Sequence, residues 1–147
     1  MASPRFRSHA SVKPSDLNAN GTMFGGALLH WIDHEAAIYA VLQLGNERVV
    51  TKYMSEIDFL SSAWLGDLLE LELEPTRFGR TSLTLRCTVR NMITRTSIIT
   101  IERIVMVGLD AEGRPVENQH TSATEGLERV PTWHAGGRRP LVTPPMS

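Results

Sequence analysis

Cys87 is the only cysteine among the 147 residues, so the chain cannot form an internal disulfide bond, and this suits a reducing compartment. The sequence has no apolar run long enough to span a membrane, and residues 1–12 lack the hydrophobic segment of a signal peptide. The formal net charge is -1 and no basic stripe is present, which argues against nucleic acid as a partner. These absences lead us to expect a cytoplasmic protein without membrane or nucleic-acid partners.

Several catalytic motifs are also missing. No G-x-S-x-G sequence is present, which argues against a serine hydrolase, and the only glycine-rich stretch lacks the G-x-x-x-x-G-K-[ST] pattern of nucleotide triphosphate sites. His30 and His34 are four residues apart, but the H-E-x-x-H arrangement of zinc enzymes is absent. We therefore expect no metal and no cofactor, with both histidines in a subunit or helix–sheet contact. Cys87 falls on the apolar face of its strand and is expected to be an inert core residue.

The most informative part of the sequence is residues 18–44. Residues 18–26 form a loop rich in glycine and asparagine, and the stretch from Ala27 to about Leu44 has no glycine or proline, which predicts a helix of about four to five turns. This helix is apolar on almost every side, which is typical of a helix buried in its domain. Asp33 nevertheless lies near its middle, where a carboxylate is costly unless it has a partner or a function.

Strand-like segments surround this helix. A short strand is expected near residues 5–10 and four more at residues 49–59, 69–74, 83–90 and 97–109; leucine and glutamate alternate most clearly in residues 69–74. Short links between consecutive strands favour an antiparallel sheet, and one helix against such a sheet gives an α+β fold. A single sheet leaves an edge unprotected, which predicts dimerisation by extension of the sheet.

The composition of the chain changes after residue 116. Glycine, proline, threonine, serine and arginine dominate residues 117–147, and few large apolar side chains are available there for docking. We therefore expect a domain at residues 1–116 and a C-terminal tail at residues 117–147 that is ordered in part at most.

One group of motifs resembles a known family. The motifs are Asn18-Ala19-Asn20-Gly21-x-x-Phe24-Gly25-Gly26 with Asp33 on the helix, then residues 48–51, Phe59, Gly66-Asp67, residues 79–82 and Gly113-Arg114. In order and spacing, from about Val12 to Val116, they resemble the hot-dog fold acyl-CoA thioesterases. The resemblance is greatest to the YciA-type bacterial enzymes and the tandem-domain cytosolic acyl-CoA hydrolases.

The resemblance implies a hot-dog fold, in which an antiparallel sheet wraps around one long buried helix. It also implies a homodimer with a continuous sheet, assembled into a hexamer as a trimer of dimers, that hydrolyses a fatty acyl-CoA thioester without a metal. The catalytic aspartate and asparagine of the family fall on Asp33 and Asn18, which come from opposite subunits. Some relatives carry glutamate where this chain has Ser55, so that position departs from the pattern.

Thioester hydrolysis needs an activated water molecule and a polarised carbonyl group. Asp33 is the candidate general base, with direct nucleophilic attack as the variant. The backbone amides of Gly25 and Gly26, at the positive end of the helix, are candidates for binding the oxyanion. Asn18 is the candidate for orienting the water or the carbonyl. The alternative for Asp33 is a buried structural carboxylate that a neighbour satisfies.

Further contacts with an acyl-CoA substrate are expected elsewhere in the chain. Arg80, Thr81 and Ser82 follow a turn and are candidates for binding the CoA phosphates or pantetheine, with a solvated hairpin as the alternative. Phe24, beside the two glycines, is another candidate substrate contact. Four large side chains are candidates for bounding the acyl pocket: Trp31, Tyr39, Met54 and Phe59.

Two other functions stay open from the sequence. A hot-dog protein that binds acyl-CoA or another ligand without hydrolysing it would carry the same motifs. A dehydratase acting on acyl thioesters would use a histidine with an acidic partner at the helix, and His30 and His34 are the candidates for that role.

Overall fold

The computed structural model describes residues 4–126, 128 and 129. It contains one long helix, α1 (Gly25–Leu44), and one short 3-10 helix, η1 (Pro14–Asp16). The strands are β1 (Phe6–Ser11), β2 (Val49–Met54), β3 (Ile57–Phe59), β4 (Leu68–Phe78), β5 (Ser82–Asn91) and β6 (Ser97–Gly108). The predicted order of one strand, a long helix and then consecutive strands is confirmed.

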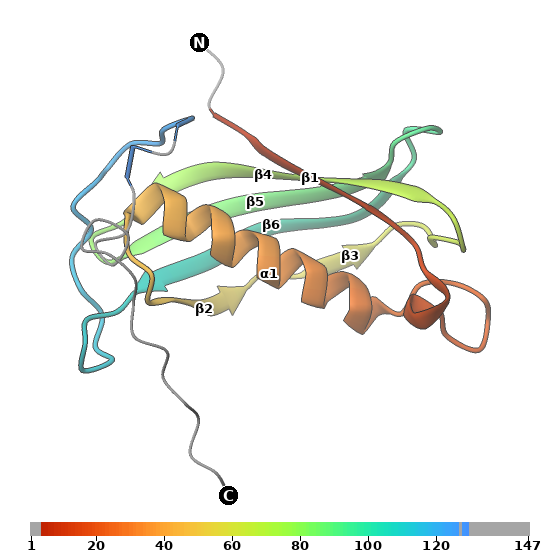
Figure 1. The fold of residues 1–147 in the computed structure, drawn as a ribbon, viewed down its shortest axis with the longest axis horizontal. Helices are drawn as coiled ribbons and strands as arrows, with labels where there is room; N and C mark the ends of the chain where they lie inside the picture. Colours follow the sequence, from red (N-terminus) through yellow and green to blue (C-terminus); the bar gives the residue numbers. More distant parts are fainter. Residues whose placement is uncertain (1–3, 127, 130–147) are drawn as a thin grey trace, which may run out of the picture.

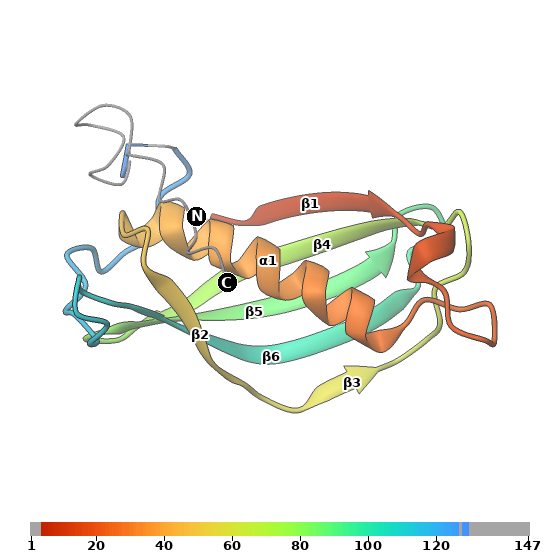
Figure 2. The same cartoon turned by 60° about the horizontal axis from the view of Figure 1, so that its bottom comes forward.

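The strands form one antiparallel sheet in the order β1-β4-β5-β6-β2, with β3 also paired to β6. The long strands β4, β5 and β6 lie at its centre, while β1 and β2 lie at its two edges. Figures 1 and 2 show α1 lying across one face of this sheet, with β1 along one side of the helix and β2 and β3 along the other. The predicted α+β fold, an antiparallel sheet wrapped around one long helix, is confirmed.

The hydrophobic core lies between α1 and the sheet. Alternate residues of β4 and β5 point toward the helix and are buried, as the period of two in the sequence predicts. In β6 neighbouring residues are buried as well, as at Ile98 and Ile99. The remaining surface of α1 stays partly open in one protomer, and Ile38 is 39% exposed. One protomer therefore covers only one face of a helix that is apolar on nearly every side. That face presents a stripe of buried residues: Leu28, Ile32, Ala36, Tyr39, Ala40, Gln43 and Leu44.

The start of α1 differs from the prediction. The helix begins at Gly25 rather than Ala27, and its first hydrogen bond runs from the amide of Leu28 to the carbonyl oxygen of Phe24 at 3.1 Å. Glycine has a low helix propensity, so a rule based on propensity places the boundary after the two glycines. The end of the helix agrees with the sequence, because Gly45 adopts a left-handed conformation with φ of 65° that suits glycine.

The predicted strand over residues 49–59 is two strands. Between β2 and β3, the amide of Ser55 donates to the carbonyl oxygen of Arg103 at 2.8 Å, and the Ser55 hydroxyl accepts from the Arg103 amide at 2.9 Å. A register shift between Thr51 and Tyr53 precedes this break. Such irregularities bend a strand, which lets this edge of the sheet curve around the helix. The Ser55 side chain is therefore engaged with the backbone of β6.

The segment after the sheet lies against the C-terminal end of α1 (Figure 1). The side-chain amide of Gln43, which is 2% exposed, donates to the carbonyl oxygen of Thr124 at 2.7 Å and accepts from the Thr124 amide at 2.8 Å. The Arg129 guanidinium donates to the Gln43 carbonyl oxygen at 3.0 Å. Residues 130–147, the larger part of the predicted tail, lie outside the described residues, and the division at residue 116 stays a prediction.

Replacing Gln43 with alanine is expected to lower the free energy of unfolding by about 1–3 kcal/mol, because both backbone groups of Thr124 lose their partner. Urea denaturation followed by circular dichroism measures this change. Gln119→Ala is the matched control, because Gln119 is exposed and its loss should change the free energy by less than about 0.5 kcal/mol. Equal values for Gln43→Ala and the wild type would show that this contact adds no stability.

Candidate active site

Asp33 lies midway along α1, exposed, on the side of the helix that faces β2. Its Oδ1 accepts a hydrogen bond of 2.5 Å from the hydroxyl of Thr51 on β2. The same hydroxyl lies 3.5 Å from the sulfur of the buried Met106 on β6. Within the part of the chain that the structure describes, the second oxygen of the Asp33 carboxylate has no hydrogen-bond partner. A carboxylate fixed at one oxygen and free at the other is suited to take a proton from a water molecule.

Thr51 is the site residue that the sequence analysis misses. The sequence shows it only as the last residue of the motif at 48–51, and alternation along β2 places it on the same face as Val49. That alternation is the signal that could have identified Thr51 as a residue facing the helix. Which helical residue it meets depends on the angle at which α1 crosses the sheet.

Asn18 shapes the loop that precedes α1. Its Oδ1 accepts hydrogen bonds from the amides of Asn20 and Thr22 at 2.9 and 3.2 Å, and its side-chain amide donates to the Thr22 hydroxyl at 3.0 Å. Gly21 follows with a positive φ of 78°, as a tight turn at an Asn-Gly pair requires. Asn18 is therefore held in a defined position by its own loop, partly buried and before the start of the helix.

Gly25 and Gly26 are the first residues of α1. The residue before them, Phe24, makes no side-chain cap, and the helical hydrogen bonds begin only at the amide of Leu28. The first amides of a helix point along its axis with no intrahelical partner, and the helix dipole makes that end positive. Gly26 is exposed, and a Cβ placed on it would meet nothing within 4 Å. These amides are open to an oxygen atom that carries negative charge.

The three predicted catalytic elements do not meet within one protomer. Asp33 follows Gly25 by eight residues on α1, which at 1.5 Å per residue is about 12 Å along the helix axis. A general base must lie within about 3 Å of the proton it takes, or reach it through one water molecule. Asn18 lies in the loop before the helix. In the sequence it is therefore nearer to the Gly25 and Gly26 amides than to Asp33.

The predicted CoA contacts lie at the other end of the protomer, where α1 ends. Arg80 is in the turn between β4 and β5, with its side chain 77% exposed and paired with Glu117 at 3.2 Å. The side chain of Asn118 donates to the carbonyl oxygens of Gly79 and Ser82 at 3.0 and 2.8 Å, so it holds this turn in place. Thr81 lies in the same turn. Arg80, Thr81 and Ser82 are thus brought together, but not with Gly25 and Gly26.

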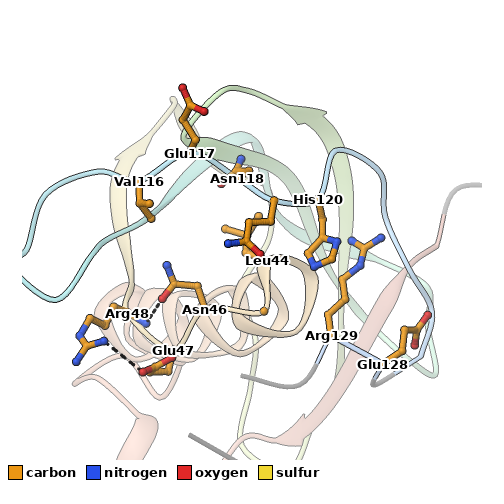
Figure 3. Close-up of a pocket in the computed structure, with 12 residues that line it drawn as sticks. Leu44, Asn46, Glu47, Arg48, Val116, Glu117, Asn118, His120, Glu128 and Arg129 are labelled. Carbon is orange, nitrogen blue, oxygen red and sulfur yellow. Dashed lines mark hydrogen bonds and ion pairs between the residues drawn. The ribbon is translucent and has the colours of Figure 1, made fainter. Parts of the chain in front are cut away.

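A pocket of about 400 Å³ lies beside this turn, between the end of α1 and residues 116–120 (Figure 3). Its lining mixes basic and acidic side chains; Arg48 pairs with Glu47 at 3.3 Å. The lining includes neither Asp33 nor Asn18. This pocket is therefore separate from the predicted catalytic residues, although its lining includes Glu117 and Asn118, which contact the turn that carries Arg80.

The remaining predicted residues occupy other places. Phe24 is 53% exposed at the start of α1. His30 and His34 are exposed and line a pocket of about 260 Å³ on the β1 side of the helix, whereas Asp33 bonds to β2. Among residues 4–126, 128 and 129, no cluster of three histidine, cysteine, aspartate or glutamate side chains is placed to hold a metal ion. Burial raises the pKa of Cys87 to about 12, so its thiol is not a nucleophile at neutral pH.

None of the helices in the described ranges is both long enough and apolar enough to cross a membrane.

Residues 20–98 match the family model of the thioesterase superfamily. An uncharacterised acyl-CoA thioester hydrolase of Buchnera aphidicola is 37% identical over 52% of this chain and 56% of its own length. The acyl-CoA thioester hydrolase YciA of Salmonella typhimurium is 30% identical over 69% of this chain and 80% of its own length. The chain spans between 49% and 62% of the length of the Buchnera protein and of two further hydrolases, from Bacillus subtilis and Haemophilus influenzae.

Solved structures of acyl-CoA hydrolases are also similar to this chain. An acyl-CoA hydrolase of Staphylococcus aureus, in complex with butyryl-CoA and CoA, superposes with a TM-score of 0.70 at 31% identity, over 78% of this chain and 68% of that one. An apo-hexameric acyl-CoA thioesterase superposes with a TM-score of 0.70 at 36% identity, over 90% and 86% of the two chains. The family match and these similarities show that the chain belongs to the thioesterase superfamily and has its hot-dog fold.

Proposed function

We propose that this protein hydrolyses acyl-CoA thioesters to a free acid and CoA. The relatives named above are called acyl-CoA thioester hydrolases, and the S. aureus protein forms a complex with butyryl-CoA. The observation that carries the proposal is the Asp33 carboxylate, held at one oxygen by Thr51, on a helix whose first amides have no side-chain cap. This arrangement supplies both a base and a group that can bind an oxyanion.

In the proposed reaction, Asp33 takes a proton from a water molecule while the water oxygen attacks the thioester carbonyl carbon. The carbonyl oxygen becomes negatively charged, and the Gly25 and Gly26 amides donate hydrogen bonds to it. Asn18 orients the water or the carbonyl. The carbon–sulfur bond then breaks, and the CoA thiolate leaves and takes up the proton held by Asp33. In the variant, the Asp33 carboxylate attacks the carbonyl carbon directly, the carbon–sulfur bond breaks as the CoA thiolate leaves, and water hydrolyses the resulting anhydride.

We place each active site between two protomers. Asp33 lies about 12 Å along the helix from the Gly25 amide of its own chain. This distance supports a site in which the Asp33 carboxylate comes from one chain and the Gly25 amide from the other. The edge strand β2 is free to pair with a second β2, and its Val50 and Tyr53 are 43% and 49% exposed. With a two-fold axis at this edge, α1 of the partner protomer runs antiparallel to α1 of the first. The partner's first helical amides and its Asn18 loop then approach Asp33, and the exposed side of α1 is covered.

Variants of the S. aureus hydrolase support the choice of residues. In its solved structures an asparagine, an aspartate and a threonine are each replaced by alanine. The asparagine and the aspartate are separated in the sequence by the same number of residues as Asn18 and Asp33. The interval from the aspartate to the threonine is one residue shorter than the interval from Asp33 to Thr51. We propose that Asn18, Asp33 and Thr51 play the corresponding parts in this chain.

We propose that the CoA phosphates or pantetheine bind at Arg80, Thr81 and Ser82, with Phe24 contacting substrate near the helix start. The Arg80 side chain is mostly exposed, and its partner Glu117 is also 71% exposed. An exposed ion pair contributes little stability, so Arg80 is free to bind a phosphate instead. We further propose that the dimers assemble into a hexamer, a trimer of dimers, as one of the similar structures is hexameric.

Thr51→Val is expected to lower kcat by about 10–100-fold, since the Asp33 carboxylate loses a hydrogen bond worth about 1.5–3 kcal/mol to a charged group. Valine keeps the branched shape, so the protein should fold normally, and KM should change little. Steady-state kinetics of thiol release measure both constants. An unchanged kcat would show that this hydrogen bond does not hold the base for catalysis.

Release of free thiol from a panel of short to long acyl-CoAs tests the proposal directly. Turnover by the wild type establishes the reaction. The alternative is a hot-dog protein that binds acyl-CoA without hydrolysing it. That reading predicts no thiol release from any thioester, together with CoA binding that calorimetry detects.

A further inference from the structure

A pocket of about 290 Å³ opens beside the first amides of α1. Gly25 forms part of its wall, so a thioester carbonyl bound at the Gly25 and Gly26 amides lies at its edge. The acyl chain continues from the carbonyl carbon, and this pocket is the described space that adjoins that position. Five large apolar side chains line it, together with the two serines Ser61 and Ser62: Met23, Leu28, Phe59, Leu60 and Ile98.

The chemistry of this pocket suits a hydrocarbon chain. No charged side chain is among its lining residues. The hydroxyl of Ser61, which also lines it, donates to the Ser97 carbonyl oxygen at 2.6 Å and is therefore already satisfied. Burying a phosphate or a carboxylate here would cost free energy without a partner, whereas methylene groups gain free energy by leaving water.

Phe59 has a special position in this wall. It ends β3, and β3 pairs with β6 through Phe59 and Ile99, which fixes the backbone. A Cβ built on Gly25 would lie 3.2 Å from the ring carbons Cε1 and Cζ of Phe59, so the ring lies directly against the start of α1. The ring is at the same time 55% exposed, so it is not part of the packed core. It therefore occupies space beside the amides at the edge of the packed core.

The other three candidates for the acyl pocket lie elsewhere. Tyr39 stacks on Phe6 of β1, with 5.3 Å between ring centroids. Trp31 lines the pocket on the β1 side of the helix, and Met54 pairs with Ile104 in the β2–β6 ladder. Phe59 is the one of the four whose side chain lines the pocket at the amides.

We propose that Phe59 determines the length of acyl chain that the enzyme accepts, an inference that rests on the proposed thioesterase function. The ring fills space next to Gly25 that additional methylene groups would otherwise occupy. Each methylene group that gains a buried place in the transition state raises kcat/KM by about fourfold. Removal of the ring therefore favours longer chains and weakens the packing of short ones.

The test compares kcat/KM for short and long acyl-CoAs in the wild type and in Phe59→Ala. The ratio of long-chain to short-chain kcat/KM should rise by about tenfold or more. Trp64→Ala is the matched control, because it removes a ring that is 55% exposed from the same end of the protein without lining this pocket. An unchanged ratio in Phe59→Ala, or an equal rise in Trp64→Ala, overturns the assignment of Phe59. No thiol release by the wild type overturns the thioesterase function itself.

Gly25→Ala provides a second test, of the contact rather than of the ring alone. The new methyl group should displace the Phe59 ring by a few tenths of an ångström and change the chain-length ratio. In the Phe59→Ala background the methyl group meets no ring and displaces none, so Gly25→Ala should change the ratio less than it does in the wild type. Non-additive effects of the two substitutions support the contact, and additive effects overturn it.

Discussion

Asparagine in place of Asp33 is expected to lower kcat for acyl-CoA hydrolysis by about 10²–10⁴-fold. The asparagine oxygen can still accept the hydrogen bond from the Thr51 hydroxyl, so the local structure should be kept. An amide cannot take a proton from water, so the loss falls on the chemical step. The affinity for CoA should stay within about twofold of the wild-type value, because Asp33 acts on the water and not on the nucleotide.

Thiol release measures the loss, and calorimetry with CoA measures binding. Glu35→Gln is the matched control. Glu35 lies two residues further along the same helix, and its replacement by glutamine removes the same negative charge. The control should keep wild-type kcat. Wild-type turnover by Asp33→Asn would remove Asp33 from the mechanism, and an inactive Glu35→Gln would then identify Glu35 as the base.

Mixed protomers of Asn18→Ala and Asp33→Asn are expected to regain about one quarter of wild-type activity, although each variant alone is inactive. Random pairing makes about half of the dimers mixed. In each mixed dimer, one of the two sites contains wild-type Asn18 and wild-type Asp33. This recovery requires that Asp33 and Asn18 of one site come from different chains. Thiol release from the coexpressed mixture measures this recovery. Mixed dimers isolated with two affinity tags should show about one half of the wild-type kcat, because one of their two sites is complete.

The control for this experiment mixes Asp33→Asn with Thr51→Val. Asp33 and Thr51 of one chain share a hydrogen bond of 2.5 Å, so both substitutions affect the same half of the site. Every site in a mixed dimer then carries one of them, and no activity should be regained beyond that of Thr51→Val. The absence of recovery in the Asn18→Ala mixture would place Asn18 and Asp33 in one chain, whereas wild-type activity of Asn18→Ala alone would exclude Asn18 from the site.

The structure also explains why the sequence of α1 is apolar on nearly every side. The face with Leu28, Ile32 and Ala36 packs on its own sheet, while Ile38 stays 39% exposed in one protomer. A sequence records the burial that the complete assembly produces, including contacts with a partner chain. The apolar surface that one sheet leaves open is therefore consistent with the proposed dimer.

The sequence by itself determined the elements of this protein. A stretch without glycine or proline gave the helix, and the alternation of leucine and glutamate gave β4, because these patterns follow from the periods of 3.6 and two residues. The motif around Gly25 and Gly26 indicates a helix start with open amides, although it does not specify the exact boundary. Local chemistry is sufficient for such features.

Only the tertiary structure decided which residues meet. It joined Thr51 to Asp33, divided the strand over residues 49–59 at Ser55, and placed the Phe59 ring against Gly25. These outcomes depend on how α1 crosses the sheet and how the sheet curves around it. No local pattern specifies that angle, because it results from the packing of side chains that are far apart in the sequence.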